Sequence, residues 1–536
     1  MAKTLMIQGT ASNVGKSLLT TGLCRLYSRR GLKVAPFKAQ NMALNSFITP
    51  QGREVGRAQA VQAAAAGTPL RAEMNPVLLK PLGDSLSRVI LLGKPWKTLR
   101  AAEYYRERPF LWSAVTGALE SLAPDFDLII VEGAGSPAEI NLKADEIVNM
   151  RVARHLNAPV LLAGDIDRGG VFAFLYGTME LLEPEERALI RGFIINNFRG
   201  DPSLLRPGLE MLKNLTGGRP TVGVVPHLRD LRLAREDSLF LDEGGMGTPK
   251  PGLVDIAVLR LPGMTNYDDF DPLAAEPGVN LRFIDSPAEL GPGSTLPRAL
   301  ILPGTETPLR ALGWLRERNL AAAVAACRDL GVSVAGIGEG FRMMGSFVRG
   351  VSGEGAPESP AGQAEPPGQV DLPGQVHLPG LGLLPMEGRF DPEEGKRLLR
   401  GLTREGDEVR GYGVPGGWVP APGDEAPSDG SAPGPMPEAG SGKAPPGAPP
   451  APEAFLVLEG GRAGGLRSAD GRVWGAALHG VFDAPGFRRR WLRSLGWTES
   501  GSPRDREELQ RREFDRLADH LEAHLDMGLL DRIIGI

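Results

Sequence analysis

A glycine-rich loop near the start of the chain sets the strongest limit on its fold. Gly9–Ser17 spells GTASNVGKS; it follows an apolar run at Leu5–Gln8 and opens a helical stretch, Ser17–Arg29. A phosphate cradle requires this context, because the backbone N–H groups of a glycine-rich turn face inward and a helix N-terminus lies behind them. The sequence therefore predicts a strand, a phosphate-binding loop and a helix, in that order.

Two side chains at the end of this loop have predictable roles with a nucleoside triphosphate and Mg²⁺. Lys16 is expected to reach the β- and γ-phosphates, and the hydroxyl of Ser17 to hold Mg²⁺. Five residues separate Gly9 from Gly15, where the common motif has four. The alternative is a glycine turn that merely precedes a helix, and Lys-Ser directly after Gly15 argues against it. The remaining loop residues expected to bind the nucleotide are Thr10, Ser12, Asn13 and Val14.

Apolar runs of strand length alternate with helical stretches such as Gly56–Ala66 through the first half of the chain. This alternation predicts an α/β fold with a mainly parallel, doubly wound sheet. A second α/β series begins near Asp255, so we expect domains at 1–243 and 253–500 and a helical segment at 504–536. The strand-like runs are Leu5–Gln8, Lys33–Phe37, Leu128–Val131, Pro159–Ala163, Gly192–Asn196 and Thr221–Val225, then Ile256–Leu261, Arg298–Pro303, Val332–Ile337 and Gly475–Leu478.

Glycine and proline number 71 and 47 among 536 residues, and much of this excess lies in two stretches. Residues 352–379 contain the crude repeat PPGQVDLPGQVHLPG, and residues 420–452 are almost entirely Pro, Ala, Gly, Ser and acidic residues. Neither stretch offers enough apolar surface to offset the entropy of ordering it. We therefore expect flexible, low-complexity insertions within the second domain.

Charge and cysteine content exclude several classes of protein. Lys and Arg number 60 against 65 Asp and Glu, a net charge of −5, which argues against nucleic-acid binding and against a polybasic membrane binder. Two cysteines cannot form a disulfide scaffold or a four-cysteine metal site, and they suit a reducing cytoplasm. The start shows no signal-peptide pattern, and no apolar run reaches the ~18 residues that span a bilayer. We therefore expect a soluble cytoplasmic protein.

Charged residues stand at the carboxyl ends of predicted strands, where ligands gather in open α/β sheets. Glu132 ends the run LIIVE and is expected to be a second Mg²⁺ ligand, with a helix-capping acid as the alternative. Lys38 follows the second strand and could neutralise a transferring phosphate, although an exposed lysine fits the spacing equally well. Asp165 and Asp167, with Arg168 and two glycines, end another strand and indicate substrate or metal contact.

The first half also carries a series of distinctive blocks: IQGTASNVGKS, FKAQNMALNS, EVGRAQAVQA, MNPVLLKP, VEGAGSPAEINLK, DIDRGGVFA, FIINNFRGD and VVPHLRDL. In this order they resemble the cobyric acid synthase family, the ATP-dependent amidases of cobalamin biosynthesis. The resemblance is dense from Thr4 to Asp242 and thinner beyond. It implies a dethiobiotin-synthetase-like P-loop domain, followed by a class I glutamine amidotransferase-like α/β domain.

The resemblance also implies a reaction. ATP would activate the b, d, e and g carboxylates of adenosylcobyrinic acid a,c-diamide as acyl phosphates, and ammonia would convert each one to a carboxamide. Charge neutralisation by Lys16, Lys38 and Mg²⁺ fits this chemistry. Its position after the second strand makes Glu54 an expected further metal ligand, and the resemblance adds Asn196 on the adenine side. The implied ligands are a corrinoid substrate, ATP and Mg²⁺; the oligomeric state, a homo-oligomer included, stays open.

The second domain departs from the family pattern. Family glutaminases carry a cysteine nucleophile in a pattern like GICGGYQMLG, whereas Gly336–Gly345 reads GIGEGFRMMG, with Gly338 at the cysteine position. Glycine offers no thiol, so no thioester can form there. His479 keeps the position of the catalytic histidine, and both cysteines are expected in the core. We therefore expect a folded but inactive glutaminase, with ammonia from solution or from a separate glutaminase.

Three other functions stay open from the sequence. The closest is an amidase like cobyrinic acid a,c-diamide synthase, which the blocks FKAQNM, EGAGSPAEINLK and DIDRGG disfavour. A second is a partitioning-type P-loop switch, which usually carries an early lysine in its loop, where this chain has Thr10–Ser12. A third is a non-catalytic P-loop binder, which the intact Lys16 and Ser17 disfavour.

Overall fold

The computed structural model describes residues 2–83, 85–143, 146–231, 233, 248–290, 296–351, 375–390, 395–414, 417–420, 452–498 and 506–536. The chain divides into two compact units, which we describe in turn. Unit 1 comprises residues 1–80, 85–236 and 507–536, and unit 2 comprises residues 81–84 and 237–506.

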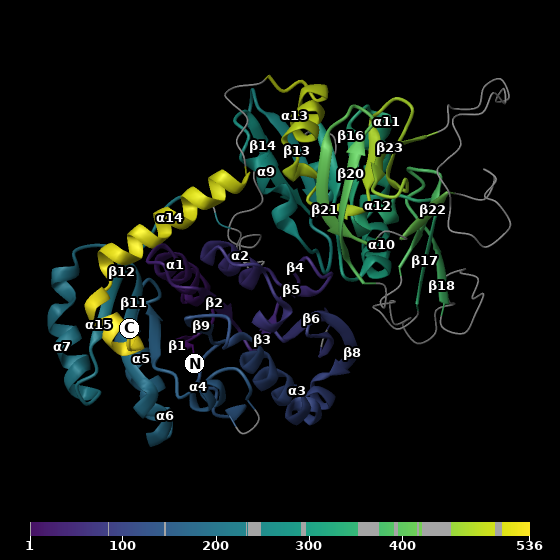
Figure 1. The fold of residues 1–536 in the computed structure, drawn as a ribbon. Helices are drawn as coiled ribbons and strands as arrows, with labels where there is room; N and C mark the ends of the chain where they lie inside the picture. The colour runs from purple at the N-terminus through teal and green to yellow at the C-terminus, as the bar shows by residue number, and fades with distance from the viewer. Residues whose placement is uncertain are drawn as a thin grey trace, which may run out of the picture. The chain divides into compact units, whose positions relative to one another are not determined.

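A parallel sheet lies at the centre of unit 1. Its strands are β1 (Lys3–Gly9), β2 (Val34–Phe37), β9 (Leu128–Glu132), β10 (Val160–Asp165), β11 (Ile190–Phe198) and β12 (Thr221–Pro226). They pair in the order β12-β11-β10-β1-β9-β2, and the pairs are parallel (Figure 1). The predicted α/β fold is confirmed here. Because β1 has a neighbour on each side, the loop that follows it opens in the interior of the sheet.

Helices cover both faces of this sheet. They are α1 (Lys16–Arg29), α2 (Arg57–Ala66), α3 (Ala101–Leu122), α4 (Met150–Leu156), α5 (Val171–Leu181), α6 (Pro184–Leu189) and α7 (Arg206–Leu215). Leu5 and Ile7 of β1 pack in one apolar cluster with Leu23 of α1, whereas Met6 packs in another with Val115 of α3. Alternate residues of a strand face opposite sides. Burial of both faces explains why these strands read as unbroken apolar runs.

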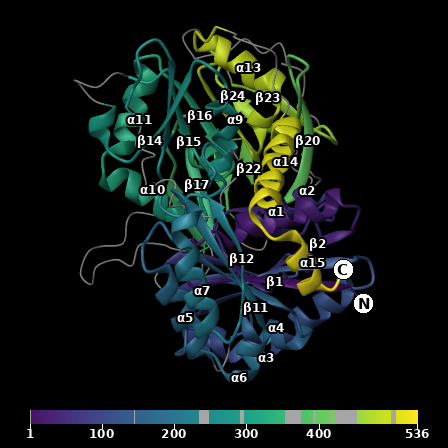
Figure 2. The same cartoon turned by 90° about the vertical axis from the view of Figure 1, so that its left-hand side faces the viewer.

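The C-terminal helices α14 (Arg506–His524) and α15 (Met527–Ile534) pack on the same face as α1 (Figure 2). A Cβ added to Gly22 of α1 would lie 2.4 Å from Cδ1 of Leu521, so the helices approach most closely at a glycine. The sequence analysis set 504–536 apart as a separate segment. Its described part instead belongs to unit 1 from residue 507 onward, because its apolar stripe is buried against α1 and the sheet.

Between β2 and α3 the chain forms two small sheets. Their strands are β3 (Gln40–Met42), β4 (Ser46–Ile48), β5 (Glu54–Gly56), β6 (Val77–Gly83), β7 (Leu86–Leu91) and β8 (Lys94–Arg100). β3 pairs with β6, β7 and β8 form an antiparallel hairpin in the same sheet, and β4 pairs with β5. These strands begin directly after Lys38 and therefore lie next to the carboxyl edge of the main sheet.

Unit 2 contains a larger mixed sheet. Its strands are β13 (Val254–Leu259), β14 (Val279–Ile284), β15 (Ala299–Leu302), β16 (Ser333–Ile337), β20 (Arg397–Thr403), β21 (Glu408–Gly413), β23 (Glu453–Leu458), β24 (Ala463–Arg467), β25 (Val473–Ala476) and β26 (Leu478–His479). They pair in the order β14-β13-β15-β16-β25-β24-β23-β20-β21-β26. The pairs from β14 to β25 are parallel, and those from β25 to β26 are antiparallel. The parallel part contains the strands that the sequence predicts.

The helices of unit 2 are α9 (Asp271–Ala274), α10 (Pro308–Glu317), α11 (Leu320–Asp329), α12 (Glu339–Met343) and α13 (Pro485–Ser494). Apolar clusters lie on both faces of the mixed sheet. Ile301 of β15 and Ile337 of β16 pack in one cluster with Trp491 of α13, and Leu300 packs in the other with Leu312 of α10. Unit 2 therefore repeats the layered plan of unit 1.

A smaller sheet of unit 2 corrects the bounds of one expected insertion. Residues 352–374 and 421–451, which make up most of both insertions, lie outside the described residues. Gln375–Pro379, expected within the first insertion, instead forms β18 and pairs antiparallel with β17 (Phe347–Val351). Val376 and Leu378 pack against an apolar cluster, which supplies the contacts that order this strand. The sheet is completed by β19 (Met386–Arg389) and β22 (Trp418–Pro420).

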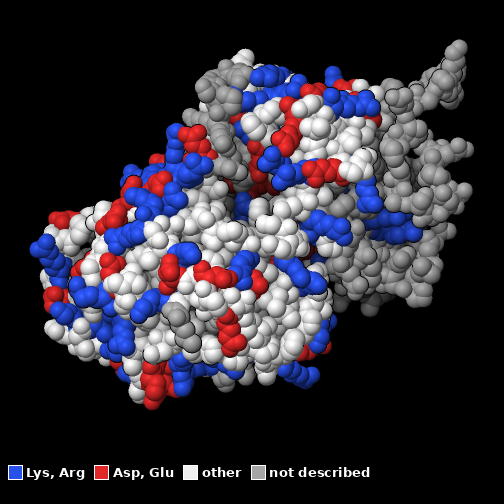
Figure 3. All heavy atoms as spheres, viewed as in Figure 1, with Lys and Arg blue, Asp and Glu red and all other residues white. Residues whose placement is uncertain are grey.

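Acidic and basic side chains are interspersed on the face drawn in Figure 3. Ion pairs link α1 and α14, such as Arg25–Asp515 at 2.8 Å and Arg29–Asp519 at 2.6 Å. Exposed pairs of this kind contribute at most about 1 kcal/mol each, so the apolar contacts dominate the packing of α14. Among the described residues, no helix is both long enough and apolar enough to cross a membrane.

Candidate functional site

The phosphate loop joins β1 to α1, and its neighbours hold its shape. Asn13 and Gly15 have positive φ angles of 61° and 96°, which asparagine and glycine adopt most readily. Asn196, near the end of β11, donates from Nδ2 to the carbonyl of Val14 at 2.9 Å. A Cβ at position 15 would lie 2.1 Å from that Nδ2, so only glycine fits. The sequence predicts Asn196 on the adenine side of the nucleotide. In this structure its side chain instead holds the phosphate loop through Val14.

Lys16, the first residue of α1, folds its side chain back over the loop. Its Nζ donates to the carbonyl of Ala11 at 2.8 Å and to that of Gly135 at 3.0 Å. The residue is 7% exposed, so the ammonium lies inside the turn. An ammonium held there can exchange carbonyl oxygens for the stronger charged acceptors of a phosphate. The other expected loop residues, Gly9, Thr10, Ser12, Asn13 and Val14, lie along this same turn.

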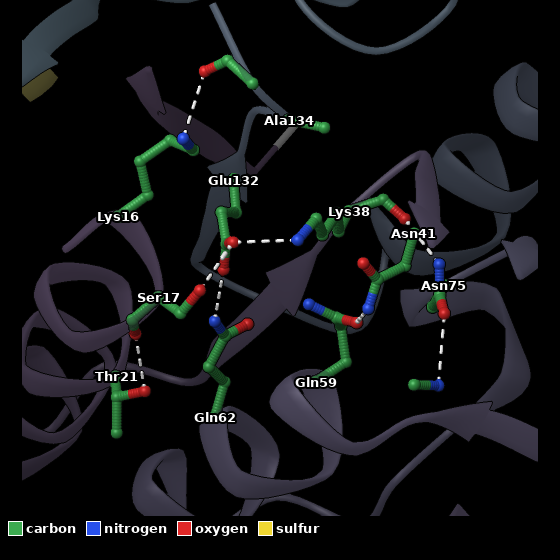
Figure 4. A network of polar contacts seen from close by, with 12 residues as sticks. Lys16, Ser17, Thr21, Lys38, Asn41, Gln59, Gln62, Asn75, Glu132 and Ala134 are labelled. Carbon is green, nitrogen blue, oxygen red and sulfur yellow. Dashed lines mark hydrogen bonds and ion pairs between the residues drawn. The ribbon is translucent and has the colours of Figure 1, made fainter. Parts of the chain in front are cut away.

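Glu132, the last residue of β9, is the centre of a buried polar cluster (Figure 4). Three side chains donate to its carboxylate: Ser17 Oγ to Oε1 at 2.8 Å, Lys38 Nζ to Oε1 at 3.0 Å and Gln62 Nε2 to Oε2 at 2.5 Å. Burial alone would raise the pKa of Glu132, but the charge of Lys38 and these hydrogen bonds hold it below its ordinary value. The carboxylate is therefore ionised at neutral pH.

The strand order explains why these side chains meet. β9 lies between β1 and β2, and the three strands run parallel, so their carboxyl ends share one edge of the sheet. Ser17 belongs to the helix after β1, Lys38 directly follows β2, and Glu132 ends β9. The structure thus brings together three residues that the sequence analysis singled out separately.

The cluster has the donor atoms that Mg²⁺ uses with nucleotides. Mg²⁺ prefers oxygen ligands and is commonly held by one or two protein groups together with phosphate oxygens. The hydroxyl of Ser17 and the carboxylate of Glu132 are 2.8 Å apart and supply such a pair. In the part of the chain that the structure describes, no group of three or more His, Cys, Asp or Glu side chains could hold a metal. The residues present therefore fit a metal shared with a nucleotide.

Glu54, the further metal ligand expected from its position after the second strand, lies on β5. Its Oε1 is 2.5 Å from Nζ of Lys80 on β6 and also accepts a hydrogen bond from Ser46. Both charged groups are buried, so Lys80 balances the charge of this carboxylate. A metal role for Glu54 stays a prediction.

The acidic pair after β10 is divided between a buried and an exposed position. Asp165 is buried and accepts from the backbone N–H of Asp167 at 2.9 Å, and its Oδ2 lies 3.9 Å from Nε of Arg168. Asp167 and Arg168 are exposed, and Asp167 pairs with Arg199 at 3.2 Å. Asp165 therefore shapes the turn, while the other two side chains remain accessible to a substrate.

The sequence analysis missed the glutamines of α2. Gln62 donates to Glu132, and Gln59 accepts from Asn41 at 3.2 Å. Both glutamines are 0% exposed. Residues three positions apart share one face of a helix. The two glutamines have this spacing in the alanine-rich run RAQAVQAAAA. That spacing was a signal in the sequence for a buried polar face.

In unit 2, position 338 lies on a sharp turn between β16 and α12. Gly338 has φ 57° and ψ −119°, outside the regions that most side chains adopt. A Cβ built on it would lie 2.7 Å from Nε2 of His479, which is closer than a side chain can pack, so any residue other than glycine requires the imidazole to shift. A strained strand-to-helix turn that aims one side chain at a histidine is the arrangement of a nucleophile elbow. The elbow is therefore preserved, and its glycine carries no nucleophile.

His479 lies between two carboxylates. Its Nδ1 is 2.7 Å from Asp269 Oδ2, and its Nε2 is 3.5 Å from Glu339 Oε2. Burial alone would lower the pKa of His479, but Asp269 and Glu339 raise it to about 9. Burial would likewise raise the pKa of Glu339, yet His479, Lys396 and Arg342 hold it well below its ordinary range. These two carboxylates therefore favour the imidazolium form of His479.

This charge state predicts how stability depends on pH. The folded-state pKa of His479 exceeds the ordinary value of 6.5, so its contribution is fully present below pH 6.5 and is lost as pH rises through about 9. We expect unit 2 to lose about 3 kcal/mol of unfolding free energy over that window. Urea unfolding followed by tryptophan fluorescence measures it. His479→Gln should remove this part of the pH dependence, and an unchanged profile in that variant would contradict the assignment.

The two cysteines have the surroundings of core residues. Cys24 on α1 and Cys327 on α11 are both free and buried. Burial raises the pKa of each thiol above its ordinary value, which leaves almost no thiolate at neutral pH. Both residues pack in apolar clusters, as the sequence analysis expected.

Comparisons with known proteins agree with this geometry. Residues 5–240 match the CobQ/CobB/MinD/ParA nucleotide binding domain, and residues 255–426 match the CobB/CobQ-like glutamine amidotransferase domain. A cobyric acid synthase of Sorangium cellulosum is 48% identical over 545 residues, covering 100% of this chain and 99% of the relative. Cobyric acid synthases of Desulforudis audaxviator and Chloroflexus aurantiacus are each 44% identical over 545 and 542 residues, with 99% or more of both chains covered.

A P-loop nucleotide-binding unit followed by a glutamine amidotransferase-type unit defines an ATP-dependent amide ligase. The relatives match from one end of the chain to the other, through both units. The chain belongs to the cobyric acid synthase family. The resemblance stated from the sequence and the predicted fold class are both confirmed.

Proposed function

We propose that this chain amidates the b, d, e and g carboxylates of adenosylcobyrinic acid a,c-diamide, using ATP and Mg²⁺ and passing through acyl phosphates. The observation that carries the proposal is the convergence of Ser17, Lys38 and Glu132 beside a phosphate loop closed by Lys16. Joining a carboxylate to a γ-phosphate brings negative charges together, and this cluster places two lysines where those charges would meet.

The proposed roles follow from the contacts. Lys16 holds phosphate oxygens inside the loop, and the amide of Gln62 keeps the carboxylate of Glu132 in place. Mg²⁺ on Ser17 and Glu132 would neutralise charge on the phosphates. Lys38 stabilises the substrate carboxylate as its oxygen attacks phosphorus and ADP leaves. Ammonia then adds to the acyl carbon, phosphate departs with the C–O bond electrons, and the nitrogen loses a proton. Asp167 and Arg168 are the proposed substrate contacts.

We also propose that the ammonia does not come from glutamine hydrolysed within unit 2. Gly338 has no thiol, and Asp269 and Glu339 together favour the cationic form of His479. Arg342 donates to the carbonyl of Arg389 at 3.1 Å and so occupies space beside the elbow. Ammonia from solution or from a separate glutaminase fits this arrangement, and the free cysteines fit the reducing environment of the cytoplasm.

The test supplies adenosylcobyrinic acid a,c-diamide, ATP and Mg²⁺ with either ammonium or glutamine, and follows product mass. We expect carboxamide formation with ammonium and at least 100-fold less with glutamine, because removal of a nucleophile costs orders of magnitude in rate. Equal turnover with glutamine would overturn the ammonia proposal. No product with ammonium, despite ATP binding, would overturn the amidation proposal.

A matched pair of variants tests the elbow itself. Gly338→Cys restores a thiol but keeps Glu339 against His479, so we expect glutamine hydrolysis to stay near background. Gly338→Cys combined with Glu339→Gly removes that carboxylate and frees the histidine to act as a base. Glutamate release from glutamine should therefore rise only in the double variant.

A further inference from the structure

Arg108 is a buried cation to which the proposed reaction assigns no role. It lies on α3 in the same stripe as Tyr104, Leu111 and Val115, which all belong to the apolar core. Arg108 itself is 8% exposed. Residues three or four positions apart share one face of a helix. The helix therefore buries a guanidinium where its pattern calls for an apolar side chain, while a small part of the residue stays accessible.

The guanidinium has no partner of opposite charge. Within the described ranges, no residue accepts a hydrogen bond from its buried Nε or Nη1 or forms an ion pair with it. Two other buried arginines have carboxylate partners: Arg282 lies 2.9 Å from Asp255, and Arg488 lies 2.9 Å from Glu276. A buried charged donor without a partner is unfavourable and calls for an explanation, such as a ligand that completes it.

The surroundings of Arg108 suit a planar anion. Its Cζ lies 3.9 Å from the ring centre of Tyr105 and 5.7 Å from that of Tyr104. A guanidinium stacked on an aromatic ring has a fixed plane, with its N–H groups directed outward from its edges. A carboxylate matches such an edge with two parallel hydrogen bonds.

The same turn of α3 is tied to the segment that carries Lys38. The hydroxyl of Tyr104 donates to Oε1 of Gln40, the first residue of β3. Burial raises the pKa of this hydroxyl well above its ordinary value, so it remains a donor. Gln40 follows Lys38 by two residues, which is about 7 Å of extended chain. A macrocyclic substrate whose reacting carboxylate lies at Lys38 extends over such distances.

We propose that Arg108 binds a second, non-reacting carboxylate of the corrinoid while another carboxylate is activated at Lys38 and Glu132. This inference rests on the proposed function, because it takes the corrinoid as substrate. Arg108 is then a specificity residue: it distinguishes a corrinoid that still carries carboxylates from one whose side chains are all carboxamides. The carboxylate also supplies the charge that the buried guanidinium lacks.

The test measures equilibrium binding to the full-length protein with Mg²⁺ and a non-hydrolysable ATP analogue. The two probes are adenosylcobyrinic acid a,c-diamide and a corrinoid with every peripheral carboxylate converted to carboxamide. We expect Arg108→Met to weaken binding of the diamide by about 30-fold or more and binding of the fully amidated probe by less than about threefold. Arg108→Lys should recover part of the loss. Arg106→Met, at an exposed position of the same helix, is the matched control and should change neither.

Equal weakening of both probes, or no weakening of either, would overturn the proposal. A second readout separates binding from structure. Because Met fits an apolar stripe and removes a partnerless charge, the unliganded Arg108→Met protein should keep or raise its unfolding temperature. A fall of more than about 5 °C would instead assign Arg108 a structural role.

Failure of the proposed function has a different signature. If the wild type binds the diamide but forms no amide from ammonium, the reaction proposal fails, and the selectivity of Arg108 is still decided by the binding data. If the wild type binds neither probe, both the corrinoid function and the carboxylate site are wrong.

Discussion

Replacing Glu132 with glutamine is expected to lower the rate of ADP formation, with corrinoid and ammonium present, on the order of 10³-fold. The substitution removes the carboxylate charge that Ser17 and Lys38 contact at 2.8 and 3.0 Å. Without that charge Mg²⁺ has one fewer anionic ligand, and the Lys38 ammonium stays buried without its counter-charge. Steady-state rates over a Mg²⁺ titration measure both effects, since a lost ligand shifts the titration to higher Mg²⁺.

Glu54 offers a matched control, because it too is a buried glutamate in contact with a lysine, Lys80. Glu54→Gln therefore reproduces the cost of leaving a lysine unpaired. If Glu54 only balances the charge of Lys80, we expect Glu54→Gln to lower the rate of ADP formation by less than tenfold and to leave the Mg²⁺ titration unchanged. A shift in that titration would support the metal role that the position of Glu54 predicts. If the Glu132→Gln variant kept the Mg²⁺ dependence of the wild type, that result would contradict the proposed role of Glu132 as a Mg²⁺ ligand.

Ending the chain at residue 505 is expected to prevent unit 1 from folding. The cut removes Phe514, Leu517, Leu521 and Ile534, each at most 5% exposed, and uncovers the face of α1 on which they pack. Burial of one large apolar side chain contributes about 1.5–3 kcal/mol. Several such losses together equal the roughly 5–15 kcal/mol by which a domain is stable. The truncated chain should appear in the insoluble fraction or lack a cooperative thermal transition.

Single substitutions separate apolar packing from the ion pairs between α1 and α14. Leu521→Ala, at a position 1% exposed, should cost about 2–5 kcal/mol of unfolding free energy. Asp519→Ala removes the exposed pair with Arg29 and should cost less than about 1 kcal/mol. Urea titrations of both variants measure the difference. A larger loss in Asp519→Ala would show that charge, not apolar contact, docks the helix.

The sequence predicted the strands and the site residues that obey local rules. β1, the phosphate loop and α1 follow one another along the chain, so spacing alone placed Lys16 and Ser17. Glu132 was predictable because a buried parallel strand is an apolar run that ends at the ligand-binding edge. The contact between Glu132 and Gln62 was not predictable, because this contact depends on how α2 packs against the sheet. The contact of Asp269 with His479 was not predicted for the same reason, because 210 positions of sequence separate the two residues.

Two features of the fold go beyond what periodicity and composition indicate, each for a physical reason. The helical period of residues 504–536 was visible, but periodicity identifies an apolar stripe and not the surface that buries it. Gln375–Pro379 was assigned to a flexible insertion from its glycine and proline content. Its alternating Val376 and Leu378 instead complete an apolar cluster, and pairing with β17 supplies the backbone hydrogen bonds. Composition describes a segment in isolation, whereas the ordering of that segment depends on the elements against which it packs.

The position of α14 and α15 has a consequence for how a cell makes this enzyme. Because about 480 residues separate α1 from α14, the covering helices leave the ribosome roughly 25–100 s after α1 at ordinary elongation rates. Throughout that interval the growing chain exposes the apolar face around Leu23 to chaperones. A chain that stalls before α14 keeps that apolar face uncovered. Synthesis of α14 and closure of this part of the core of unit 1 are thereby coupled in one molecule.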